Sequence, residues 1–126
     1  MNKQPIYDNR AHDCPFYQIP HWLMHGPQFR DLKPEAKLLF GLLLDRLDLS
    51  GRNEWRDKNN EVYIYYTIKN VEEDLSCSHE KAIKLLDSLE EKKLIRRVRQ
   101  GLGKPNRIYL TYMDPYHALE IGNPDF

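Results

Sequence analysis

Apolar residues recur at helical spacing near the middle of the chain and predict a central helix. Pro34 suits the first helical position, and Glu35 suits the positive end of the helix dipole. The Ser50-Gly51 pair is typical of a helix end. Between these limits, apolar positions recur every three or four residues at Ala36, Leu39, Phe40, Leu43 and Leu47. Further leucines widen this stripe, so we expect a helix over 34–50 that is buried on most sides.

Two shorter helices are predicted after the central one, with a tight turn between them. Thr67 can cap the first of these, and its apolar face is formed by Ile68, Val71 and Leu75. The segment Ser76–Ser78 breaks that pattern after two turns. Ser78 can cap the second helix, whose apolar stripe is formed by Ala82, Leu85, Leu86 and Leu89. A short helix, a tight turn and a second capped helix are the parts of a helix-turn-helix.

Segments rich in β-branched and aromatic residues lie on both sides of this unit. Val62–Tyr66 precedes it, and Leu94–Arg99 and Arg107–Tyr112 follow it. The last two are separated by a turn-rich tip, Gln100–Asn106, so we expect them to form a hairpin. The order strand, helix, turn, helix, hairpin predicts an α+β fold, a winged helix-turn-helix. The tip with its flanking residues, 99–107, is called the wing below.

The first 30 residues form a separate arm that contains four prolines and several aromatic rings. We expect a short strand at Phe16–Ile19 and a helical turn at His21–His25. Large aromatic side chains gain from leaving water, so the arm is expected to pack on the domain or on a second copy of the chain. The chain then divides into an arm (1–30), a winged-helix domain (31–113) and a tail or start of a linker (114–126).

Charge is unevenly distributed along the chain, although the net charge is zero. The segment from Lys92 to Arg107 holds seven basic residues and no Asp or Glu, whereas the rest holds twelve basic and nineteen acidic residues. A local basic surface on an acidic body favours a directional contact with a polyanion. The apolar stretches are too short to span a bilayer, and the two cysteines do not form a disulfide framework. We therefore expect a cytoplasmic protein without a membrane contact.

The second helix of the helix-turn-helix is the predicted recognition helix. Its apolar stripe faces the core, and the step of about 100° per residue then decides which side chains point outward. Unpaired backbone amides at its N-terminus can hold a phosphate. The residues expected to contact double-stranded DNA, in the major groove, are Ser78, His79, Glu80, Lys81, Lys84 and Ser88.

The wing supplies the second predicted contact. Gly101 and Gly103 let its backbone turn sharply, and such a wing lies along the DNA backbone or in the minor groove. The wing residues expected to contact DNA are Arg99, Gln100, Lys104, Asn106 and Arg107. The positive charges among them are the strongest candidates, because a turn tip gains nothing structural from charge. Lys92 and Lys93 are better explained as the end of a helix.

Other classes of function are weakly supported by the residues. His21 and His25 are four positions apart, but a zinc site needs further ligands, so we expect no metal. Phosphate-loop, nucleophile-elbow and His-Glu-x-x-His motifs are absent from the sequence, so we expect no enzyme activity and no cofactor. Two alternatives use the same fold, namely a transcriptional regulator and a protein-interaction winged-helix module. The regulator would recognise a single promoter palindrome instead of repeated sites.

Several segments together resemble the N-terminal domain of the RepA_N replication initiators of Gram-positive plasmids. The matching segments are Phe16–Pro20, Leu32–Arg46, Val62–Ile64, Glu73–Ser78, Lys81–Leu86 and Arg99–Asn106. The resemblance runs from about Phe16 to Tyr112, and its most specific part is Arg-Gln-Gly-Leu-Gly-Lys-Pro-Asn at Arg99–Asn106.

This resemblance implies a more specific function than composition and periodicity indicate. Such proteins start plasmid replication by binding repeated sites at the origin through a winged-helix domain similar to those of DnaD-type primosomal proteins. It also implies a homodimer, and a further C-terminal domain that engages host replication proteins and lies outside this chain. The aromatic arm is then a candidate for the two-fold interface.

Overall fold

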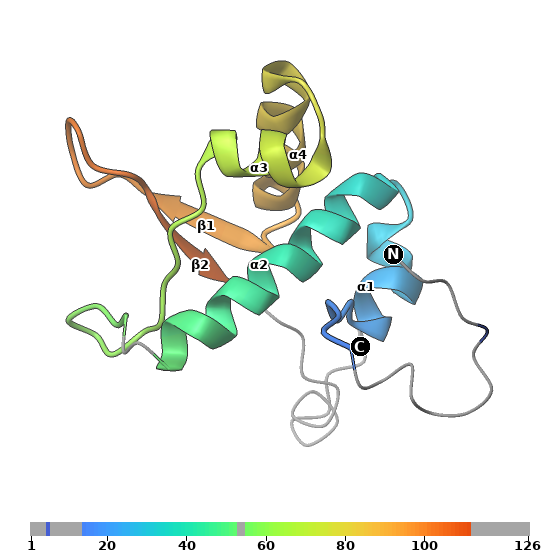
Figure 1. Cartoon of the computed structure of the whole chain (residues 1–126), viewed down its shortest axis with the longest axis horizontal. Coiled ribbons are helices and arrows are strands. Elements are labelled where there is room, and N and C mark those ends of the chain that lie inside the picture. Colours follow the sequence, from blue (N-terminus) through green and yellow to red (C-terminus); the bar gives the residue numbers. More distant parts are fainter. Residues whose placement is uncertain (1–4, 6–13, 53–54, 112–126) are drawn as a thin grey trace.

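The computed structural model describes residue 5, residues 14–52 and residues 55–111, with only the backbone of 48–52 considered. Figure 1 shows its elements, which are α1 (His21–His25), the 3-10 helix η2 (Pro27–Phe29), α2 (Pro34–Arg52), α3 (Ile68–Leu75), α4 (His79–Glu91), β1 (Ile95–Val98) and β2 (Arg107–Leu110). The predicted tail, and the last residue of the second predicted hairpin strand, lie outside the described residues.

Helix α2 is the centre of the fold, as its wide apolar stripe predicts. It runs diagonally across the molecule in Figure 1, with α3 and α4 beside its N-terminal half and the hairpin next to them, where β2 also contacts α2. Its side chains Ala36, Leu39, Phe40 and Leu43 are fully buried. They share one core with Ile64, Val71, Leu86, Leu89 and Ile108. Each buried leucine of this core stabilises the fold by about 1.5–3 kcal/mol relative to an exposed one.

The described part of the N-terminal arm packs against α2. Gly41 permits this close approach, because a Cβ at that position would lie 3.1 Å from the Gln18 carbonyl oxygen and 3.2 Å from Ile19 Cγ1. Leu23 and Phe29 are buried, and the Trp22 ring contacts the rings of Phe29 and Phe40. The predicted helical turn at His21–His25 is confirmed as α1.

The predicted strand at Phe16–Ile19 is wrong. Residues 15–20 have no regular secondary structure, and Phe16 and Tyr17 are each 55% exposed. The described residues offer this segment no neighbouring strand with which to pair.

The helix-turn-helix forms with the caps that the sequence predicts. Thr67 Oγ1 accepts a hydrogen bond from the Asn70 amide, and Asn70 Oδ1 accepts one from the Thr67 amide, which completes a capping box at α3. Ser76 ends α3 in the left-handed conformation, with φ of 51°. Ser78 Oγ then accepts a hydrogen bond from the Lys81 amide and begins α4.

The hairpin pairs β1 with β2 in antiparallel register, with Ile95 opposite Leu110 and Val98 opposite Arg107. The predicted strand Val62–Tyr66 is present only as an extended segment with two single-residue bridges. Ile64 exchanges two backbone hydrogen bonds of 2.9 Å with Ile108 and so lies beside β2. Three helices, this segment and the hairpin make the α+β winged helix, as predicted. No helix in the described ranges is long and apolar enough to cross a membrane.

Arg97 of β1 fixes the hairpin to α4. Its backbone N–H and its Nε donate to Glu90 Oε2 over 3.2 and 3.3 Å, and its Nη2 donates to Glu90 Oε1 over 3.1 Å and to Asp87 Oδ1 over 2.6 Å. The Arg97 side chain is only 21% exposed, so solvent screens these contacts less than surface ion pairs. These contacts help to fix the hairpin, and with it the wing, relative to α4.

Replacement of Glu90 by glutamine tests this connection through its pH dependence. The hydrogen bond from Arg97 holds the pKa of Glu90 below its ordinary value of 4.5. A lowered folded-state pKa means that the stabilisation is complete above the unfolded value and is lost as the pH falls through the lower folded value. Glu90→Gln is expected to cost about 0.5–1 kcal/mol of unfolding free energy at neutral pH. In acid, urea unfolding should show a smaller further loss for this variant than for the parent protein.

Glu91→Gln is the matched control, because it makes the same change one residue along the same helix at an exposed position. It should follow the parent protein at both pH values. If all three proteins lose the same stability in acid, Glu90 does not hold the hairpin in this way.

Candidate nucleic-acid interface

Helix α4 presents its predicted recognition face away from the core. The stripe Ala82, Leu85, Leu86 and Leu89 is buried, as expected from the periodicity. Five of the six recognition-helix candidates line one surface hollow of about 520 Å³, beside Lys33 at the start of α2. These five are Ser78, Glu80, Lys81, Lys84 and Ser88. The structure therefore brings the predicted helix residues together on one surface.

Several of these candidates also make contacts inside the molecule. Lys81 Nζ lies 2.7 Å from Glu35 Oε2, and this hydrogen bond lowers the pKa of Glu35 and raises that of Lys81. His79 Nδ1 lies 3.1 Å from Glu72 Oε2 and links the two helices of the helix-turn-helix. The Ser88 hydroxyl donates to the Lys84 carbonyl oxygen over 2.8 Å.

Lys84 is the cation of α4 that is most available to an external partner. Its side chain is exposed, and among the described residues its ammonium group has no ion-pair partner. Carboxylates lie around it on the outward side of the helix, at Glu80, Asp87 and Glu91. Within the described part of the chain, Asp87 is the one of these three with an ion-pair partner, Arg97. Lys84 is therefore an exposed positive group on an otherwise acidic helix face.

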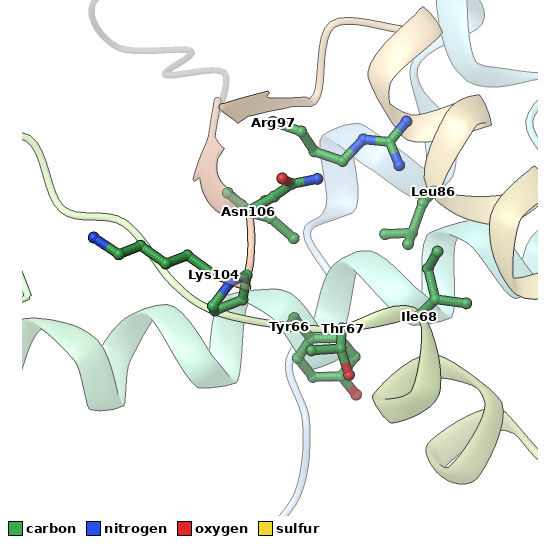
Figure 2. A pocket seen from close by; sticks show the side chains of 9 residues that line it. Tyr66, Thr67, Ile68, Leu86, Arg97, Lys104 and Asn106 are labelled. Carbon is green, nitrogen blue, oxygen red and sulfur yellow. The ribbon is translucent and has the colours of Figure 1, made fainter. Parts of the chain in front are cut away.

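The wing presents two exposed basic side chains, Arg99 and Lys104. Within residues 14–52 and 55–111, neither has an ion-pair partner. Figure 2 shows the Lys104 side chain extending away from Leu86 and Ile68, while Arg97 reaches toward them. The exposed wing residue Asn106 lies with Lys104 on a second hollow of about 260 Å³, which adjoins Thr67 at the start of α3. The wing and the helix-turn-helix thus meet on one side of the molecule.

Two other wing candidates have structural roles that the sequence did not reveal. Gln100 Nε2 donates to Tyr65 Oη over 3.2 Å and to the Pro105 carbonyl oxygen over 2.8 Å, which joins the two ends of the wing. The Arg107 guanidinium lies 4.5 Å from the centre of the Tyr63 ring, and hydrogen bonding with Tyr109 raises its pKa. Arg107 therefore has a structural role, contrary to the expectation for a basic residue at the wing.

The remaining basic residues of the segment 92–107 are also largely used inside the molecule. Lys92 caps α4, and its Nζ lies 2.6 Å from Asp31 Oδ1, which confirms that this lysine belongs to a helix end. Arg96 lies 3.1 Å from Glu61 Oε1 and stacks over the Tyr109 ring. In the segment 92–107, the exposed basic side chains without an ion-pair partner among the described residues are therefore Arg99, Lys104 and Lys93.

Sequence reasoning did not single out Arg97 and Glu90, although they place the wing relative to α4. One signal was available. Asp87 and Glu90 are three residues apart on one helix, and the first basic strand follows within ten residues.

The described residues contain no metal-binding cluster, that is, no group of three or more His, Cys, Asp or Glu side chains that could hold a metal ion. His21 and His25 lie with their rings edge to face at 6.2 Å.

The chain is similar to replication initiators in sequence. The family model "Replication initiator protein A (RepA) N-terminus" matches residues 15–120. Among curated proteins, a "41 kDa protein" of Lactobacillus helveticus is 30% identical over 101 residues, which is 75% of this chain and 29% of the relative. The chain thus spans less than a third of the length of that relative.

Solved structures with the same fold cover nearly the whole chain. One, "N-Terminal domain of DNA binding protein", has a TM-score of 0.72 and 29% identity, and covers 99% of this chain and 98% of its own. A second, "Structure of Rep-DNA complex", has a TM-score of 0.72 and 30% identity over 98% of both chains. A third, "Structure of MDR initiator", has a TM-score of 0.68 and 29% identity over 98% of this chain and 99% of that one. With a family model that matches most of its length, the chain belongs to the family of replication initiator protein A (RepA) N-termini.

Proposed function

We propose that this winged helix is a sequence-specific, non-catalytic domain that binds double-stranded DNA at repeated sites in a plasmid replication origin. Helix α4 enters the major groove, and the wing lies on the adjacent backbone and minor groove. Family membership and the similar Rep-DNA complex support this proposal. An initiator acts where its plasmid is, in the cytoplasm.

The observation that carries the proposal is the pair of exposed basic side chains on the wing. Arg99 and Lys104 are exposed, and the segment 92–107 contains no carboxylate to neutralise them. Most other basic side chains of that segment have internal partners, so these charges are not explained by the stability of the fold. Phosphate groups of a duplex are the partner that such a pair fits.

The acidic residues around Lys84 indicate that α4 and the wing contact different parts of the DNA. Carboxylates repel phosphates, so a helix that carries Glu80 and Glu91 gains little from lying along the backbone. Directed at base edges, the same groups can accept from cytosine N4, and a lysine can donate to guanine. We therefore assign sequence discrimination to α4 and most of the salt-dependent affinity to the wing.

The wing assignment is tested by Lys104→Ala, measured as duplex affinity against salt concentration. The duplexes are those that the domain selects from a random-sequence pool, and a mixed-sequence duplex gives the non-specific affinity. Loss of Lys104 should weaken binding to both and lower the slope of log K against log salt by about 1, because one phosphate contact is removed. Lys84→Ala should mainly reduce the preference for the selected duplex, by about 1–3 kcal/mol.

Lys58→Ala is the control, because Lys58 is exposed in the turn of residues 57–60, which Figure 1 shows well away from the wing and α4. It should leave both affinities unchanged. An unchanged affinity and slope for Lys104→Ala would refute the wing contact, and a parent domain without salt-dependent duplex binding would favour a protein-interaction module.

We also propose that the domain acts as a homodimer through its N-terminal arm. Phe16 and Tyr17 are about half exposed, and Met24 of α1 and Leu38 of α2 are further exposed apolar side chains. The domain that recruits host replication proteins would lie in the part of the relatives that this chain does not span.

Sedimentation velocity tests this dimer with the double variant Phe16→Ala/Tyr17→Ala. We expect the parent protein to sediment as a dimer at micromolar concentration and the variant to shift toward the monomer, with an unchanged circular dichroism spectrum. A parent protein that stays monomeric both alone and on DNA with two sites would contradict the proposal.

A further inference from the structure

Leu102 is the most exposed large apolar side chain of the described residues. Its relative exposure is 104%, whereas the other exposed ones, Phe16, Tyr17, Met24 and Leu38, lie between 43% and 55%. Its neighbours are Gly101 and Gly103, with Gln100 and Lys104 beyond them, and none of the described core residues covers it. Neither stability nor packing explains a leucine at this position.

The backbone of the wing makes a narrow tip with Leu102 at its end. Gly101 and Gly103 have φ angles of +116° and +77°, and a Cβ added to either would meet nothing within 4 Å. The two glycines are therefore explained by the positive φ angles of the turn, and not by close packing against a neighbour; they also keep the tip narrow. The Lys104 amide donates to the Gly101 carbonyl oxygen over 3.3 Å and closes the turn. Figure 1 shows this loop standing clear of the rest of the molecule.

We infer that Leu102 is an apolar wedge that enters the minor groove of bound DNA and contacts, or partly separates, a base step. This inference rests on the proposed function. Apolar side chains used in this way unstack bases and kink the duplex, and flanking cations neutralise the phosphates that approach each other. Arg99 and Lys104 lie three and two residues from Leu102 and provide that charge.

The charges around Leu102 favour nucleic acid over a protein partner. A leucine that docks into a protein pocket needs no cation at its side, and the wing carries two exposed ones without a carboxylate. A minor groove combines a narrow apolar space between sugars with two rows of phosphates, so it accepts both the leucine and its basic neighbours.

Leu102→Ala separates this contact from the phosphate contacts of the wing. On the selected duplex, we expect roughly tenfold weaker binding, since a buried leucine side chain is lost from the complex. The salt slope should not change, because no phosphate contact is removed. The bend of the duplex, measured by energy transfer between dyes at its two ends, should decrease. Leu102→Met, which is apolar and of similar size, should restore both affinity and bend.

Lys58→Ala is again the control, since it shortens an exposed side chain outside the wing and should leave both affinity and bend unchanged. The thermal midpoint of Leu102→Ala should equal that of the parent protein, because the fold does not use this side chain. Parent-like affinity and bend for Leu102→Ala would overturn the inference while salt-dependent binding by the parent still supported the proposed function. A change of oligomeric state in Leu102→Ala without a change in affinity per domain would also overturn it, in favour of a protein contact.

Discussion

The burial of one face of α4 is the constraint on which the rest of the structure depends. Ala82, Leu85, Leu86 and Leu89 are almost completely inaccessible to water, and they pack against α2, α3 and β1. Because a helix turns by 100° per residue, this packing leaves no freedom in the direction of Lys84 on the other side. The hydrophobic stripe, which never contacts a ligand, therefore decides which polar residues can.

Some basic side chains of this domain stabilise the fold, and others remain exposed on its surface. Arg97 holds the hairpin to α4 through two carboxylates, Lys92 joins the end of α4 to Asp31, and Arg107 lies over the Tyr63 ring. Of these three side chains, Arg97 is the one that holds the hairpin, and with it the wing, against α4. Arg99 and Lys104 remain exposed on the wing, and the hairpin holds them in a defined position relative to the outward face of α4. A DNA duplex, with phosphates along both of its grooves, can contact both surfaces at once.

The helices could be predicted from the sequence, because their signals are local. Thr67 and Ser78 cap helices within three residues of themselves, and the apolar stripe of α4 repeats within four. Interactions between distant residues could not be predicted. The partner of Lys81 is Glu35 of another helix, and Val62–Tyr66 depends on β2 for its few hydrogen bonds. For the same reason, a count of basic residues overstated the unpaired charge of the hairpin, and the strand predicted at Phe16–Ile19 has no pairing partner among the described residues.

The division between a recognition helix and a wing is tested most directly by footprinting both grooves of a duplex that the domain has selected. Dimethyl sulfate reports guanine N7 in the major groove, and hydroxyl radicals report the minor-groove edge of the backbone. We predict protected guanines beneath α4 and a separate region of reduced radical cleavage about five base pairs away, where the minor groove faces the wing. Protection of the major groove with uniform radical cleavage throughout would contradict a wing that lies in the minor groove.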